Sequence, residues 1–296
     1  IMNAPKGLFP AKFFGRGLFE VDGTALEFQT AYFCDRKNMV KIVKSASEQF
    51  NTAYKHRALP IVVMPDVVYA STLNDNIDSL NNMPIGIGML TKEPLLYDFT
   101  LNKVTPILAS KFGGEKIVFV KTLIDMFKKI DKVKVNIIDF TKTFEEVYKE
   151  DYYCDNFDEA LASLNNYIMS NKKKEEKNIN VIIGVGLLKN KLSEKGIAII
   201  NNIFNNLPSI NNSYFVFVDS YSSYKNLQTE IWYQSNIDSA SGIWLGEDVG
   251  NQMVIGINNL SLEDRKNMFP YIGFSVIKGE YRVFKHVVED GVNKDE

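Results

Sequence analysis

The residues that most directly suggest a chemistry form a glycine-containing loop between an apolar segment and a helix-like segment. Residues 104–108 are apolar, and residues 117–130 carry apolar side chains at helical spacing. Between them the chain reads Ser-Lys-Phe-Gly-Gly-Glu-Lys-Ile over residues 110–117. The phosphate-binding loop of nucleotide hydrolases reads G-x-x-x-x-G-K-[ST] and lies between a strand and a helix. The sequence therefore predicts a degenerate version of such a loop.

Three positions of this loop depart from the working pattern. Ser110 replaces the first glycine, Glu115 replaces the glycine before the lysine, and Ile117 replaces the Ser or Thr that binds magnesium. The loop residues that remain are Lys116, Gly113 and Gly114. Such loops bind phosphate because backbone N–H groups converge on it at a helix N-terminus. Glu115 adds a negative charge there, and Ile117 offers magnesium no oxygen.

We therefore expect negligible ATP hydrolysis, with Glu115 and Ile117 as the main local obstacle to nucleotide binding. No cofactor is expected to be required, and any binding of ATP and magnesium is expected to be weak. The alternative is an ordinary strand–loop–helix unit with a chance pair of glycines.

A second nucleotide motif is also degenerate. In P-loop proteins another strand ends in an acidic residue that holds magnesium. The candidate strand covers residues 179–185, and Gly184, Val185 and Gly186 stand where this Walker B acid is expected. The alternative is that the segment is simply a core strand. Asp219 ends the next apolar segment, and we expect it to be a helix N-cap or turn residue.

Three large aromatic residues lie close together near the C-terminal third, namely Trp232, Tyr233 and Trp244. Most such residues are core residues. The alternative is an exposed groove in which they anchor an amphipathic helix of a partner protein.

Composition limits the function classes. The 296 residues are 45% hydrophobic, with a net charge of −2 and a pI of about 5.9. A non-specific DNA motor usually carries a basic surface, so no nucleic-acid partner is expected. The two cysteines have no metal-ligand spacing, and no metal site is expected. No apolar run approaches the roughly 18 residues that a membrane-spanning helix needs.

Two regions are predicted along the chain. The first 75 residues should contain a hairpin near 15–31, a helix near 39–51 and an extended stretch at 59–65, followed by a polar linker at 74–82. Beyond this, strands and helices alternate, which favours an α/β fold with a mainly parallel sheet and helices on both faces. The expected strands are 104–109, 134–140, 179–185, 214–219 and 242–246, the helices are 117–130, 156–169 and 193–206, and a terminal hairpin covers 271–287.

Several short motifs, in this order, resemble a known family. They are Gly15-Arg16-Gly17-Leu18, residues 27–31, Leu59-Pro60 with Met64-Pro65, residues 83–88, residues 236–246, and Gly273-Phe274-Ser275 with Lys278-Gly279. Together they resemble FtsK/SpoIIIE-type ATPase modules. They are most similar to the C-terminal, third module of the EssC family, the membrane-anchored motors of type VII secretion in Firmicutes. The resemblance covers nearly the whole chain.

The resemblance implies a RecA-like P-loop NTPase domain at residues 76–296, preceded by the tail of another module and a linker at 1–75. It implies a cytoplasmic domain of a membrane-anchored protein. Its expected partners are secreted helical-hairpin substrates of the WXG type, neighbouring ATPase modules of the same chain and other secretion-system subunits. The last module of this family is often degenerate and implicated in substrate recognition. A weakly active or nucleotide-gated ATPase and a DNA translocase module are the competing hypotheses.

Overall fold

The computed structural model describes residues 15–21, 24–30, 35, 37–53, 62–148, 157–170, 177–266 and 269–290. The chain divides into two compact units, Ile1–Ile61 and Val62–Glu296. Each unit is described by itself.

The first unit contains the predicted hairpin and helix. Strand β1 (Arg16–Val21) pairs antiparallel with β2 (Thr24–Gln29), and helix α1 covers Met39–Ala53. The turn predicted at residues 22–23 lies outside the described residues. The helix has no buried residue, so the apolar side chains that repeat along it are exposed within this unit.

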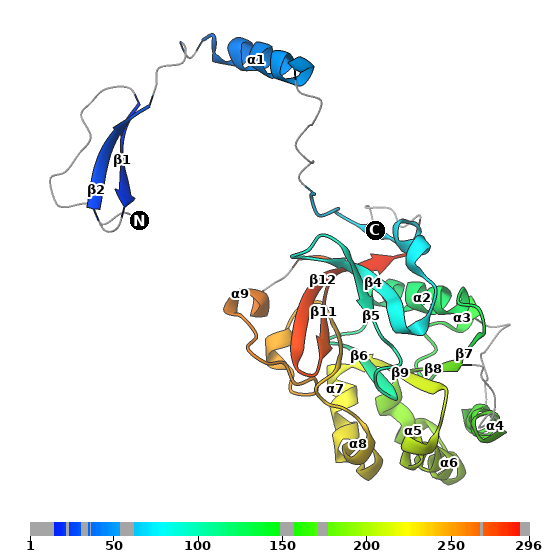
Figure 1. The fold of residues 1–296 in the computed structure, drawn as a ribbon. Coiled ribbons are helices and arrows are strands. Elements are labelled where there is room, and N and C mark those ends of the chain that lie inside the picture. The colour runs from blue at the N-terminus through cyan, green and yellow to red at the C-terminus, as the bar shows by residue number, and fades with distance from the viewer. Residues whose placement is uncertain are drawn as a thin grey trace. The chain divides into compact units, whose positions relative to one another are not determined.

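The second unit is built on one ten-stranded sheet (Figure 1). Its main path runs β5-β4-β12-β11-β10-β6-β9-β8-β7, and β3 (Val68–Tyr69) pairs with β12 off this path. The strands of the path are β4 (Met83–Gly88), β5 (Pro94–Tyr97), β6 (Val104–Ala109), β7 (Val133–Asp139), β8 (Lys177–Ile183), β9 (Ser213–Ser220), β10 (Gly242–Leu245), β11 (Ile272–Ile277) and β12 (Glu280–Val288).

The sheet is mixed rather than mainly parallel. One half of the sheet is parallel and consists of β10, β6, β9, β8 and β7. The other half is antiparallel and consists of β11, β12, β4 and β5, and it joins the first half through the antiparallel pair β10–β11. The predicted terminal hairpin is β11–β12, with its turn at Lys278 and Gly279. It is an integral part of the sheet, because β12 pairs with β4 on its other edge.

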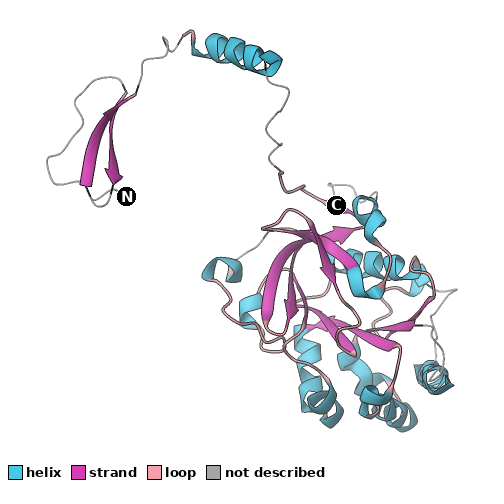
Figure 2. Ribbon diagram, viewed as in Figure 1, coloured by secondary structure: helices cyan, strands magenta, loops and turns pink. Residues whose placement is uncertain are grey.

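Helices cover both faces of this sheet, as predicted (Figure 2). The helices are α2 (Glu115–Lys128), α3 (Glu145–Tyr148), α4 (Phe157–Ser170), α5 (Leu188–Lys191), α6 (Glu194–Asn205), α7 (Tyr221–Tyr224), α8 (Ile231–Asn236) and α9 (Leu262–Arg265). Strand β6 shows why two cores form. Successive side chains of a strand point to opposite faces, so Ile107 joins one apolar cluster and Leu108 joins the other.

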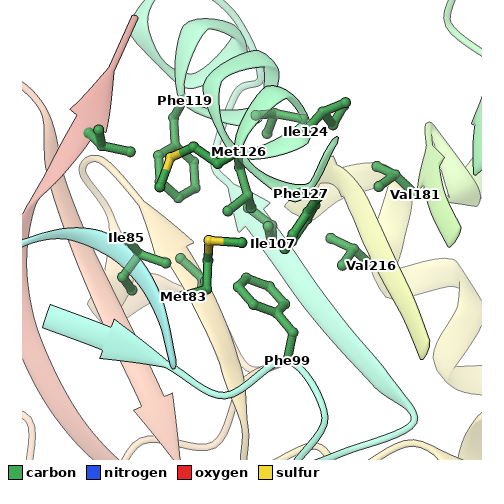
Figure 3. Packing of buried hydrophobic residues seen from close by; sticks show 14 of the residues in the cluster. Met83, Ile85, Phe99, Ile107, Phe119, Ile124, Met126, Phe127, Val181 and Val216 are labelled. Atoms are coloured by element: carbon green, nitrogen blue, oxygen red, sulfur yellow. The ribbon is translucent and has the colours of Figure 1, made fainter. Parts of the chain in front are cut away.

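The apolar cluster between the sheet and α2 fixes the position of the candidate phosphate loop, residues 110–117. Phe119 and Phe127 of α2 pack toward Ile107 of β6 and Met83 of β4 (Figure 3). Because both the strand before the loop and the helix after it are anchored in this core, the loop between them is held at both ends.

The prediction of a polar linker at residues 74–82 is wrong. Residues 74–76 end a short 3₁₀ helix, Ala70–Asn76, and residues 80–82 form a second one, Leu80–Asn82. Leu73 and Leu80 are buried in the α2-side core, so isolated leucines anchor a segment whose average composition is polar. Together with the pairing of β3 to β12, this places residues 68–75 in the larger unit, ahead of the boundary expected at residue 76.

Candidate functional site

The order of the strands brings three loops together at the carboxyl end of β6. The degenerate phosphate loop follows Ala109, the last residue of β6. Leu245 of β10 and Ser220 of β9 both pair with Ala109, one on each side. Parallel strands end at the same edge of a sheet, so the loops after β10 and β9 flank the phosphate loop.

Lys116 is engaged by carboxylates of this chain. Its side chain is only 9% exposed, and its Nζ lies 3.1 Å from Glu115 Oε1 and 3.5 Å from Glu247 Oε2. Ser110 Oγ donates a hydrogen bond to the other oxygen of Glu247, Oε1, at 3.3 Å. The pKa of Glu247 lies below its ordinary value, first because its own backbone N–H donates to it, and further because of Lys116. The positive charge that a phosphate would need is therefore already paired.

The loop after β10 is fixed where it approaches Lys116. Trp244 Nε1 donates to the backbone carbonyl of Glu247 at 2.9 Å, and Gly246 N donates to Ile272 O at 2.8 Å. Gly246 has a φ of +81°, and a Cβ at this position would lie 2.6 Å from Lys116 Cε. Glycine therefore allows both the left-handed backbone and the close passage of the lysine.

The glycine pair of the loop retains open space. A Cβ built on Gly113 or Gly114 would meet no atom within 4 Å. Gly114 has a φ of +54° and precedes α2, and no side chain caps the helix there. Glu115 begins the first turn, and Ile117 packs against the core.

The end of β8 cannot readily hold the missing acid. Gly184 has a φ of +70°, and a Cβ there would lie 2.5 Å from Thr141 Cγ2. A Cβ on Gly186 would lie 2.5 Å from the backbone oxygen of Ser223, and Val185 is fully buried. Positions 184 and 186 therefore favour glycine: a side chain at either would clash with a neighbour, and residue 184 also has a left-handed backbone.

Other acids at this edge bind backbone groups. Asp219 accepts hydrogen bonds from Gly186 N and Ser220 N, both at 2.7 Å, and burial raises its pKa. Asp219 is thus the penultimate residue of β9 and connects it to the loop after β8, and the expectation of a helix N-cap or turn residue is wrong, since Ser220 is the N-cap of α7. Asp139, at the end of β7, accepts from Thr141 N and Phe144 N.

These residues do not fit ATP with magnesium. The hydroxyl that would bind magnesium is absent at Ile117, Lys116 is paired, and Gly184 has no room for a carboxylate. Among the residues that the structure describes, no group of three His, Cys, Asp or Glu side chains is arranged to hold a metal ion.

The predicted aromatic groove does not exist at the residues named for it. Trp232, Tyr233 and Trp244 are all buried in the core on the α6 and α8 face. Trp232 is 4% exposed, and its ring centroid lies 4.4 Å from that of Phe204. The first interpretation of these three residues, as core residues, therefore agrees with the structure.

A different surface of the second unit is hollowed. A groove of about 1340 Å³ lies between the β4–β5 connection, β5, the start of β12 and the segment that begins with α9. Its exposed apolar side chains include Leu90, Leu96 and Phe269, and Leu90 is 94% exposed. Charged residues also line it, namely Glu93, Glu263, Asp264, Lys266 and Arg282. No linear pattern in the sequence identifies this groove, because it forms from separate segments.

No helix in the described parts of the chain is both long and apolar enough to cross a membrane.

Solved structures of P-loop ATPases share this fold. EssC (ATPases 2 and 3) from Geobacillus thermodenitrificans superposes with a TM-score of 0.69 and 15% identity, covering 97% of this chain and 57% of that one. Thermomonospora curvata EccC (ATPases 2 and 3), in complex with a signal sequence peptide, gives 0.60 and 13% identity over 95% of this chain and 54% of that one. The cytoplasmic domain of EssC gives 0.59 and 13% identity, with 95% and 59% covered.

These likenesses establish the class of fold, a RecA-like α/β ATPase fold. More particularly, the chain has the fold of an EssC-type ATPase module, which confirms the fold that the sequence motifs predicted. It spans little more than half the length of these structures. No protein-family model and no curated protein sequence matches the chain.

Proposed function

We propose that this chain is a module of a type VII secretion motor that does not hydrolyse ATP, and that it docks secreted substrates and regulates neighbouring modules. The observation that carries the proposal is the pairing of Lys116 with Glu115 and Glu247 in a loop without a magnesium ligand. The module corresponds to the third, C-terminal ATPase of the motor and belongs to the cytoplasmic part of a membrane-anchored protein.

Its partners are secreted helical-hairpin proteins of the WXG type, the neighbouring modules and other secretion subunits. Nucleic acid is not among them, since the chain carries a net charge of −2. It requires no cofactor.

The absence of hydrolysis follows from transition-state chemistry. Phosphoryl transfer needs a cation against the developing charge and a residue that positions water, and losing such groups costs several kcal/mol. Steady-state ATP turnover with magnesium, compared between the parent and Lys116→Ala, tests this. Equal rates at background level are expected. A magnesium-dependent rate that disappears in Lys116→Ala would contradict it.

The docking role is assigned to the groove around Leu90, Leu96 and Phe269. Its occupant is the apolar C-terminal tail of a secreted helical protein, and the support is the EccC structure, which contains a signal sequence peptide. Exposed apolar anchors in a hollow suit a helix that presents apolar side chains on one face. The acidic and basic residues along the rim suit the tail's polar side.

Replacing Leu90 by Asp tests this assignment. Truncating or charging a central anchor typically costs about 2 kcal/mol or more, or roughly thirtyfold in affinity. Anisotropy of a labelled tail peptide should show this loss for Leu90→Asp. It should show none for Ile231→Asp, whose side chain is 80% exposed and does not line the groove. Unchanged binding by a folded Leu90→Asp variant would exclude the groove as the docking site.

A further inference from the structure

Glu247 is the feature of the site that the sequence motifs do not contain. We propose that its carboxylate is an internal anion that takes the place of a phosphate at Lys116 and closes the loop to anionic ligands. This deepens the proposed function, because it names what keeps the loop from binding nucleotide.

The carboxylate spans the loop from end to end. One oxygen accepts from Ser110, at the first position of the eight-residue motif, and the other lies against Lys116, at its seventh position. A bound anion contacts the same two ends of a phosphate loop through a backbone turn and a lysine. Glu247 therefore makes the contact with Lys116 that an anionic ligand would otherwise make, while its other oxygen binds the hydroxyl group of Ser110.

The fold holds this carboxylate in place from the neighbouring strand. Trp244, in β10, donates to the backbone carbonyl of Glu247, and Gly246 bonds to Ile272 of β11. Because β10 lies directly beside β6, Glu247, the second residue after β10, has only a short distance to reach the loop. Trp244, buried for packing, also acts here as a positioning residue.

The contact is nevertheless open to solvent on one side. The side chain of Glu247 is 43% exposed, that of Glu115 is 37% exposed, and the space beside Gly113 and Gly114 is free. The single charge of Lys116 faces two carboxylates, so the cluster of these three side chains carries a net charge of −1 where a phosphate would meet Lys116. Removing one carboxylate leaves one positive and one negative charge at the N-terminal end of α2, where the helix dipole favours an anion.

Calorimetric titration with inorganic pyrophosphate tests the proposal on the full chain. Glu247→Gln keeps the shape of the side chain and removes its charge, so its affinity for pyrophosphate should exceed the parent's by about tenfold or more. The gain should disappear in Glu247→Gln combined with Lys116→Ala. Glu280→Gln is the matched control: it removes a charge at the exposed start of β12, outside the loop and the groove, and should bind like the parent.

A folded Glu247→Gln variant that binds pyrophosphate no better than Glu280→Gln would overturn the proposal. If Glu247→Gln does not fold, Glu247→Ala serves the same purpose, because it also removes the carboxylate from Lys116 and Ser110. It should also gain affinity, and no gain would overturn the proposal. Unchanged peptide binding by Leu90→Asp would contradict the docking role of the proposed function but not this inference, and a failure of Glu247→Gln to gain affinity would contradict this inference but not the docking role, so the two can fail separately.

Discussion

Replacing Trp232 by alanine is expected to destabilise the second unit rather than to remove a surface anchor. The indole is 4% exposed and packs on Phe204 at 4.4 Å and near Phe217 at 6.4 Å between ring centroids. A buried tryptophan removes roughly 200 Å² from water, which contributes about 5 kcal/mol at about 25 cal/mol per Å². Alanine retains part of this, and measured Trp-to-Ala losses are about 3–5 kcal/mol.

Thermal unfolding followed by circular dichroism measures this loss. For a unit of this size, about 4 kcal/mol lowers the Tm by roughly 10 °C. Ile231→Ala is the matched control, because Ile231 is the preceding residue and its side chain is 80% exposed. It should melt within about 2 °C of the parent. If Trp232→Ala instead melts like the parent and loses affinity for a tail peptide, the assignment of Trp232 to the core is refuted.

Three further substitutions or conditions test other parts of the structure. Burial lowers the pKa of His286 to about 4, from an ordinary value of 6.5. The unfolded chain therefore binds more protons between these values, and urea titrations should show stability falling by about 2 kcal/mol from pH 7 to pH 5. In His286→Gln this part of the pH slope should be absent. Gly184→Asp should lower the Tm, because it places a Cβ at φ +70° against Thr141, and it should not create ATP turnover. Turnover in a stable Gly184→Asp variant would show that the site can accept an acid. Gly246→Ala should cost about 1–2 kcal/mol in urea unfolding, since the new methyl group strains the turn and displaces Lys116; an unchanged midpoint would show that the turn adapts.

Local sequence patterns predicted the individual elements well. Residues 104–109 form β6 with the expected bounds, and the expected helices at 117–130 and 193–206 appear as Glu115–Lys128 and Glu194–Asn205. These segments have uniform apolar runs or clear helical spacing, so local pattern and tertiary burial agree. The segment at 74–82 failed because two buried leucines determine its structure, whereas its average composition is polar.

The site was only partly predictable for a related reason. Lys116 and its altered neighbours follow from a contiguous motif, and the glycines at 184 and 186 follow from the absence of an acid. Glu247 does not follow from any local motif. It becomes part of the site only because β10 lies beside β6 in the sheet, and strand order depends on long-range pairing.

The aromatic residues show that residue type alone does not predict whether a side chain is buried. Trp232 and Trp244 have the residue type of interface anchors as well as that of core residues, and type alone does not distinguish the two. Burial distinguishes them, and it is set by α6, α8 and the sheet together. The groove around Leu90 was missed because its walls come from segments far apart in the sequence.

Titration of the purified chain with ATP and magnesium by calorimetry tests the central claim most directly. With Lys116 paired to Glu115 and Glu247, and without a magnesium ligand at Ile117, no binding is expected at micromolar concentrations of nucleotide. A micromolar dissociation constant that depends on magnesium and is lost in Lys116→Ala would contradict the account.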